Sequence, residues 1–136
     1  MMTHPDHIQF LMPATLASTP GYTQVVKVTG GQTIYLAGQV ALDSSRNLIG
    51  RGDFRAQAQQ VFENIKEALA AVGADFSHVV KLNIYMVDRS HLPILREVRD
   101  LYVNTQAPPA NTLVEVRALA QEEFLLEIEA IASLPA

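Results

Sequence analysis

Apolar and polar positions divide the chain into segments with the period of a strand and segments with the period of a helix. Gln24–Val28 and Thr33–Val40 predict two strands, joined as a hairpin across Gly30 and Gly31. Val79–Val87 alternates and is rich in β-branched residues, which is typical of a strand. Two further strands are predicted at Thr112–Val116 and Leu125–Ala132.

Two amphipathic helices are predicted between these strands. Asp53 can cap the first helix, and Gly73 occupies a position that favours its end. Its apolar residues recur at three- and four-residue steps, at Phe54, Ala58, Val61, Ile65, Ala68, Leu69 and Val72. Ser90 can cap the second helix, and Pro93 is tolerated in its first turn. One face of this helix carries Leu92, Leu95, Val98, Leu101 and Tyr102.

The resulting order, ββ-α-β-α-ββ, predicts an α+β fold in which a single sheet carries both helices on one face. The other face of the sheet then needs cover. The strand at Val79–Val87 has an apolar side formed by Val80, Leu82, Ile84 and Met86. Its other side, with Val79, Tyr85 and Val87, is hardly polar. We therefore expect this face to be buried against another subunit.

Length and composition indicate one packed domain over residues 1–136, with about the first eight residues expected to be mobile. Apolar residues make up 49% of the chain and charged residues 18%, which favours a globule over disorder. The longest apolar stretch, Ala68–Ala74, is far too short to span a membrane. The N-terminus has no secretory signal, so we expect a cytoplasmic protein without a membrane partner.

Charge and metal-ligating residues narrow the classes of function. The net charge is −4, and no stripe of Lys and Arg appears, so a nucleic-acid partner is not expected. The chain has no cysteine, which excludes disulfides, thiolate metal sites and a cysteine nucleophile. No histidine has a partner at metal-ligand spacing, so we expect no metal.

Six short motifs lie in order between Gly21 and Ala132. They are Gly21-Tyr22-Thr23-Gln24, Ala37-Gly38-Gln39, the helix from Gln57 to Ala71, Val79-Val80-Lys81, Pro109 to Val116, and Glu127 to Ala132. They resemble motifs of the RidA (YjgF-type) family, also called endoribonuclease L-PSP-like. The first and last resemble the family's Gly-Pro-Tyr-x-Gln and Glu-Ile-Glu-Ala-Ile-Ala, although here Pro20 precedes the glycine instead of following it.

This resemblance implies a chorismate-mutase-like α+β fold, assembled as a homotrimer with a cleft at each subunit interface. RidA itself hydrolyses reactive imines and enamines to a keto acid and ammonia. The imine is already an electrophile, so the resemblance implies neither a metal nor a cofactor. A positioned water attacks, a carboxyl group manages the protons, and an arginine clamps the carboxylate of the substrate bidentately.

Residue by residue, the resemblance assigns one catalytic position and five substrate-binding positions. Glu127 matches the glutamate credited with activating water. The substrate-binding positions are Tyr22, Gly38, Leu95, Asn111 and Leu113. Among these, Leu95 stands near an asparagine of the family, Asn111 replaces the clamp arginine, and Leu113 replaces a cysteine. Acid/base capacity is therefore kept, whereas recognition of a carboxylate is lost.

The weakening of carboxylate recognition that follows from the loss of the arginine can be estimated from hydrogen-bond energies. A charge-assisted hydrogen bond contributes about 1.5–3 kcal/mol against about 0.5–1.5 kcal/mol for a neutral one, and the clamp supplies two. Arg117 lies six residues along the same strand, about 20 Å away at a rise of ~3.3 Å per residue, so it cannot replace the clamp. The Asn111 amide suits a neutral amide, carbonyl or hydroxyl group.

Structural explanations for these residues remain open at this point. Glu127 and Glu129 share one face of a strand and are also explained as edge charges or as interface partners. Tyr22 can cover the core, and Asn111 can bond its own backbone at the start of a strand. Three functions follow: a RidA-like hydrolase of imines, enamines or a related C–N substrate, with weak activity on 2-imino acids; a non-catalytic trimer that binds a small metabolite; and an endoribonuclease or translation inhibitor.

Overall fold

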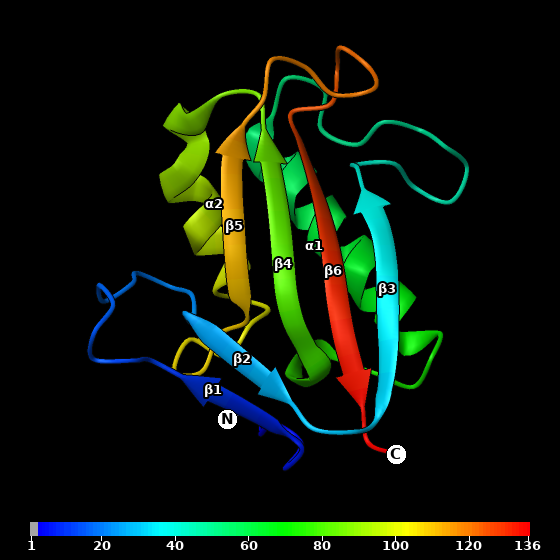
Figure 1. Cartoon of the computed structure of the whole chain (residues 1–136). Coiled ribbons are helices and arrows are strands. Elements are labelled where there is room, and N and C mark those ends of the chain that lie inside the picture. The colour runs from blue at the N-terminus through cyan, green and yellow to red at the C-terminus, as the bar shows by residue number, and fades with distance from the viewer. Residues whose placement is uncertain (1–2) are drawn as a thin grey trace.

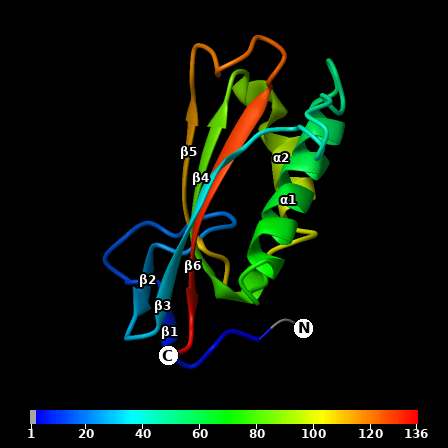
Figure 2. The same ribbon diagram turned by 90° about the vertical axis from the view of Figure 1, so that its right-hand side faces the viewer.

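The computed structural model describes residues 3–136, and its core is a four-stranded sheet covered on one face by two helices (Figures 1 and 2). The strand order is β3 (Gln32–Gln39), β6 (Leu126–Leu134), β4 (Val79–Met86) and β5 (Ala110–Glu115). The strands β4 and β5 are parallel, and the other neighbours are antiparallel. The helices are α1 (Phe54–Ala70) and α2 (Leu92–Arg99). The predicted α+β fold class is confirmed.

Two short N-terminal strands form a separate antiparallel ribbon (Figure 1). β1 (Ile8–Leu11) pairs with β2 (Val25–Val28), whereas the predicted hairpin between β2 and β3 does not form. β3 pairs with β6 instead, and there Leu36 joins the hydrophobic core. The side chains of β2 are mostly exposed, so core burial does not hold this strand in the main sheet.

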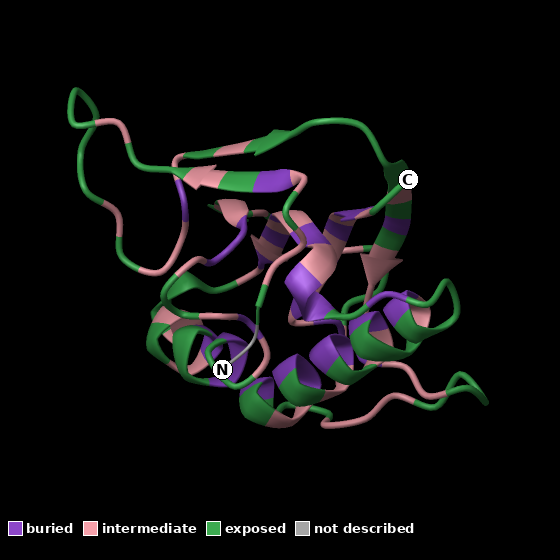
Figure 3. Ribbon diagram, turned by 90° about the horizontal axis from the view of Figure 1, so that it is seen from below, coloured by how far each residue is buried: buried purple, intermediate pink, exposed green. Residues whose placement is uncertain are grey.

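The core lies between the sheet and the buried side of α1 (Figure 3). Asp53 caps this helix as predicted, since its side chain accepts a hydrogen bond from the backbone of Ala56 at 3.1 Å. Seven side chains of the helix are buried: Phe54, Gln57, Ala58, Val61, Phe62, Ile65 and Leu69. They meet buried residues of the two central strands, which are Val79, Leu82, Ile84, Met86, Leu126, Ile128, Ala130 and Ala132.

The second helix is shorter than its pattern predicts. A 3-10 turn, η2 (Arg89–His91), precedes α2, and Asp88 rather than Ser90 supplies the capping side chain, accepting from the Ser90 backbone at 2.9 Å. Pro93 sits in the first turn of α2 as predicted. Leu101 lies beyond the end of the helix and is 76% exposed, so the apolar face ends at Val98.

The open face of the sheet is more polar than the sequence suggests. A β-bulge between Val79 and Lys81 turns Val79 into the core, where it is fully buried. Beyond the bulge, the open side of β4 presents Lys81, Asn83 and Tyr85. The expectation that β4 is apolar on both sides was therefore wrong, because the bulge changes which side Val79 faces.

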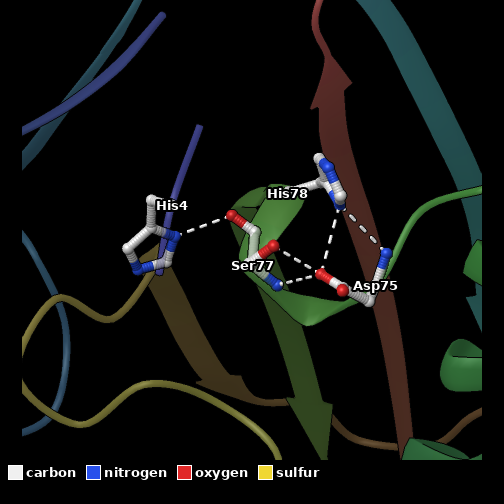
Figure 4. Close-up of polar contacts among 4 residues, drawn as sticks. All are labelled: His4, Asp75, Ser77 and His78. Atoms are coloured by element: carbon white, nitrogen blue, oxygen red, sulfur yellow. Dashed lines mark hydrogen bonds and ion pairs between the residues drawn. The ribbon is translucent and has the colours of Figure 1, made fainter. Parts of the chain in front are cut away.

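A cluster of serine, aspartate and histidine near the N-terminal segment caps a turn (Figure 4). The Asp75 side chain accepts from the backbone and the hydroxyl of Ser77, and its backbone donates to Nδ1 of His78 at 3.0 Å. His4 donates to the Ser77 carbonyl at 2.7 Å. The serine hydroxyl donates to a carboxylate and not to an imidazole, so the cluster lacks the arrangement that activates a nucleophile.

Within residues 3–136, no helix has the length and apolar character needed to cross a membrane. The same residues contain no group of three or more His, Cys, Asp and Glu side chains that could hold a metal ion.

Candidate functional site

A cavity of about 370 Å³ lies between α2, the start of β5 and the loop that precedes β2. Its lining consists of Pro20, Tyr22, Leu92, Arg96, Arg99, Asn111, Thr112 and Leu113. Three of the predicted substrate-binding residues, Tyr22, Asn111 and Leu113, are thus brought together in one place. Leu95 is fully buried in the core and does not line the cavity; Leu92, on the same helix, does.

Hydrogen bonds of Thr23 hold the Tyr22 loop against the start of β5. The buried side chain of Thr23 donates to the Pro108 carbonyl at 2.5 Å, and its backbone donates to the Pro109 carbonyl at 3.2 Å. Thr19 adds a hydrogen bond to the carbonyl of Tyr22. These hydrogen bonds hold the backbone next to Tyr22 against Pro108 and Pro109. Pro109 lies two residues before Asn111, so Tyr22 and Asn111 are kept close together.

The Asn111 side chain has unused hydrogen-bonding capacity. Its amide oxygen is buried, and neither its oxygen nor its nitrogen bonds to any residue within 3–136. A buried polar group without a partner costs about 1–3 kcal/mol. Such a group at the wall of a cavity is well placed to bond a ligand, and an amide can act as donor and acceptor.

Arg99 is a buried arginine at the same cavity. The residue is 5% exposed; its Nε donates a hydrogen bond to Oδ1 of Asp100 at 3.1 Å, and its Nη2 lies 3.1 Å from the same oxygen as an ion pair. Gly21 packs directly on the guanidinium, so a Cβ at this position would lie 2.1 Å from Nη2. Gly21 also has φ +83°, which other residues rarely adopt, so the glycine is required twice over.

Glu127 and Gly38 form a second group, on β6 and β3. A Cβ on Gly38 would lie 2.2 Å from Oε2 of Glu127, so only glycine lets the carboxyl group approach the β3 backbone this closely. Gly38 also lines an open cleft of about 650 Å³ between the end of β3, the following loop and α1. Glu127 does not line the cavity at Asn111, so within residues 3–136 the two groups lie apart.

Glu129, next to Glu127 on the open face, is already engaged. Its Oε1 accepts from Asn83 at 3.1 Å and from the Tyr85 hydroxyl at 2.9 Å. The hydrogen bond to Glu129, aided by burial and by the charges of Glu129 and Glu127, raises the pKa of Tyr85. Glu129 therefore organises the open face of the sheet, while Glu127 makes no hydrogen bond to a residue within 3–136.

Sequence reasoning missed Arg96 and Arg99 as lining residues of this cavity. A signal was present, because Arg99 lies seven residues after Leu92 and four after Leu95. That spacing places it on the buried side of α2, where a charged residue is rare without a partner or a function.

The comparisons with known proteins agree with this fold and these motifs. Residues 12–134 match the model of the family described as Endoribonuclease L-PSP. Protein DfrA of Myxococcus xanthus is 43% identical over 111 residues, covering 82% of this chain and 83% of the relative. The 2-iminobutanoate/2-iminopropanoate deaminase of Dermatophagoides farinae is 35% identical over 129 residues, covering 89% and 97%.

A solved structure extends the likeness to the whole fold. The YyfB protein of Yersinia pestis, a member of the conserved Rid family described as of unknown function, superposes with a TM-score of 0.86 at 35% identity. The match covers 94% of this chain and 99% of YyfB. Fold and motifs together thus define a Rid-type protein. The chain belongs to the Endoribonuclease L-PSP family, which is the RidA (YjgF-type) family.

Proposed function

We propose that this protein is a RidA-like hydrolase of reactive imines, enamines or a related small C–N compound, with weak activity on small 2-imino acids. The observation that carries the proposal is the cavity in which Tyr22, Asn111 and Leu113 meet. Each stands at a position that the family uses to contact its ligand. A relative that bears the name of a 2-iminobutanoate/2-iminopropanoate deaminase supports the reaction class.

The chemistry requires only water and a proton carrier. Water adds to the imine carbon, the C–N bond of the resulting amino alcohol breaks, and ammonia leaves as the carbonyl forms. Glu127 is the proposed base and acid, since its carboxyl group makes no hydrogen bond to a residue within 3–136. Gly38 keeps space beside that carboxyl group, and a side chain there would displace it.

The site is proposed to be completed by a second subunit of a homotrimer. Glu127 and Asn111 do not share a cavity within one chain, yet both stand at positions matched to the family's site. A neighbouring subunit that presents its Glu127 to the Asn111 cavity would bring the two side chains to one ligand, although they do not share a cavity within one chain. Subunit assembly of this kind follows the closed symmetry of most small oligomers.

Ammonia release from freshly generated imines tests the proposal. The panel contains 2-imino acids and imines without a carboxylate, and wild type is compared with Glu127→Gln, which keeps the size of the side chain. We expect Glu127→Gln to lose most of the about 10²–10⁴-fold contribution of a positioned acid/base. Glu129→Gln is the matched control, because Glu129 lies on the same strand and is bonded to Asn83 and Tyr85, so its activity should change only a few-fold.

The alternative is a trimer that binds a small metabolite without turning it over, and the neutral Asn111 favours it. A folded Glu127→Gln variant with full activity, or a wild type without ammonia release on any imine, would contradict the hydrolase and leave the binding protein. An endoribonuclease has less support, since the chain has a net charge of −4.

A further inference from the structure

The charged side chains at the Asn111 cavity are all cationic. Arg96 and Arg99 line it from α2, and no aspartate or glutamate is among the lining residues. β5 contributes only the uncharged Asn111, Thr112 and Leu113. Position 111 is therefore neutral, while the positive charge of the cavity comes from the helix.

The two arginines have N–H groups that make no hydrogen bond within the fold. Within residues 3–136, Arg96 makes no ion pair and no side-chain hydrogen bond, and its residue is exposed. Nη1 of Arg99 has no hydrogen-bond partner among the same residues, since the guanidinium contacts Asp100 through Nε and Nη2. The Asp100 side chain is 45% exposed, so water screens part of its charge.

A buried guanidinium with a free edge has strong chemical preferences. Its N–H groups bond best to an anionic oxygen, and a carboxylate can accept two of them at once. The Asn111 amide, in contrast, suits an uncharged C–N or carbonyl group. The two kinds of group occupy different segments of the lining, α2 and β5, so they are suited to different ends of one ligand.

We propose that the ligand of this cavity carries a carboxylate that is bound by Arg99 and Arg96 and is separated from the reacting carbon at Asn111. The inference rests on the proposed function in that it takes the ligand to be a small C–N compound or its carbonyl product. It names the substrate class: imines whose acid group lies further along the carbon chain, instead of on the imine carbon. A volume of about 370 Å³ gives room for such a ligand, since small-molecule sites begin at about 300 Å³.

Stable ketones test the recognition without requiring turnover. Calorimetric titration of the full-length protein compares 4-oxopentanoate, its uncharged methyl ester and 2-oxobutanoate, whose carboxylate is on the carbonyl carbon. We expect 4-oxopentanoate to bind at least about tenfold tighter than the ester, as charge-assisted hydrogen bonds imply. It should also bind more tightly than 2-oxobutanoate.

Variants assign the preference to the arginines. Arg99→Gln should abolish the advantage of the acid over the ester, and Arg99→Lys should retain part of it. Arg96→Gln should reduce the advantage and serves as the decisive variant if Arg99→Gln does not fold, since Arg96 is exposed. Arg51→Gln is the matched control, because Arg51 is an exposed arginine outside the cavity, 3.7 Å from Glu123.

A purely structural role of Arg99 would lower the unfolding temperature but would weaken acid and ester equally, which would overturn the proposal. No binding of 4-oxopentanoate, equal affinity for acid and ester, or tighter binding of 2-oxobutanoate would overturn it as well. The hydrolase proposal can be refuted separately from the carboxylate-binding proposal. Glu127→Gln should keep the same preference among ketones. A protein that shows this preference but releases no ammonia would refute only the proposed catalysis.

Discussion

Asn111 and Glu127 project from opposite faces of the same sheet. Asn111 pairs with Leu82 of β4, and Glu127 pairs with Tyr85 of the same strand. Side chains alternate along a strand, so two residues three apart face opposite ways. Leu82 is buried beneath the helices and Tyr85 lies on the open face, which agrees with this assignment. A single chain therefore cannot apply both side chains to one ligand.

The first prediction is that the protein is a homotrimer in solution. A site that needs Asn111 from one subunit and Glu127 from another requires association, and the motifs of this family imply three subunits. Light scattering behind a sizing column should give about three times the subunit mass of 14.9 kDa. A mass near that of one subunit would contradict both the trimer and the shared site.

Much of the fold follows from the sequence because local signals agree with the packing. Asp53 caps a helix whose apolar period matches the core. The ribbon of β1 and β2 was not predictable in the same way, since Ile8–Leu11 is only four residues long and its partner β2 is mostly exposed. The bulge after Val79 was equally hidden, because Val79 and Val80 are both valines and the pattern does not show which of them enters the core.

The residues that line the cavity at Asn111 could be predicted from the sequence only where a motif contains them. Tyr22, Asn111 and Leu113 meet in one cavity although the chain separates Tyr22 from the other two by most of its length. Arg99 lies outside the motifs, and its role depends on a three-dimensional contact with Gly21 that no local pattern encodes. Leu95 shows the converse: it was matched only to the neighbourhood of a family asparagine, and it lies in the core while the adjacent Arg96 lines the cavity.

The second prediction concerns the missing clamp. Asn111→Arg should raise the hydrolysis of small 2-imino acids by about tenfold or more, since it restores a bidentate charge-assisted contact next to the imine carbon. The keto acid formed from a 2-imino acid generated in situ is the measurement. Wild-type turnover equal to that of an arginine-bearing relative would show that the clamp is not needed here.

The third prediction is a pH dependence of stability from Tyr102. Burial, together with a 2.7 Å hydrogen bond to Glu63, raises the pKa of Tyr102 to about 12 from a usual value of 10.0. Because the pKa is higher in the folded state, the protonated Tyr102 hydroxyl makes its whole contribution to stability below pH 10. This contribution is lost as the pH rises from 10 to about 12.

Tyr102→Phe isolates this effect, since the ring keeps its stacking on Phe62 at 5.1 Å between centroids. The variant should lose about 1 kcal/mol at neutral pH through the missing hydrogen bond. Its free energy of unfolding, measured by denaturant titration, should then fall less steeply than that of the wild type above pH 10. Parallel slopes for the two proteins would mean that Tyr102 titrates as an ordinary tyrosine.

The last prediction tests directly whether each site is shared between subunits. Two variants are needed: Glu127→Gln removes the proposed base, and Leu113→Trp fills the cavity beside Asn111. Each alone should form trimers with little activity on the substrate that the imine screen identifies. Because the two changes lie on opposite faces of the sheet, a mixed trimer can pair the open cavity of one subunit with the intact Glu127 of its neighbour.

Co-refolding the two variants in equal amounts should therefore restore activity. At random assembly, about a quarter of the interfaces combine an open cavity with an intact base, so about a quarter of wild-type activity is expected. Mixing the folded trimers without unfolding them is the control and should restore nothing unless subunits exchange. If co-refolded trimers of both variants stay inactive, cavity and carboxylate do not act on a common ligand, and the arrangement of Asn111 and Glu127 serves two separate purposes.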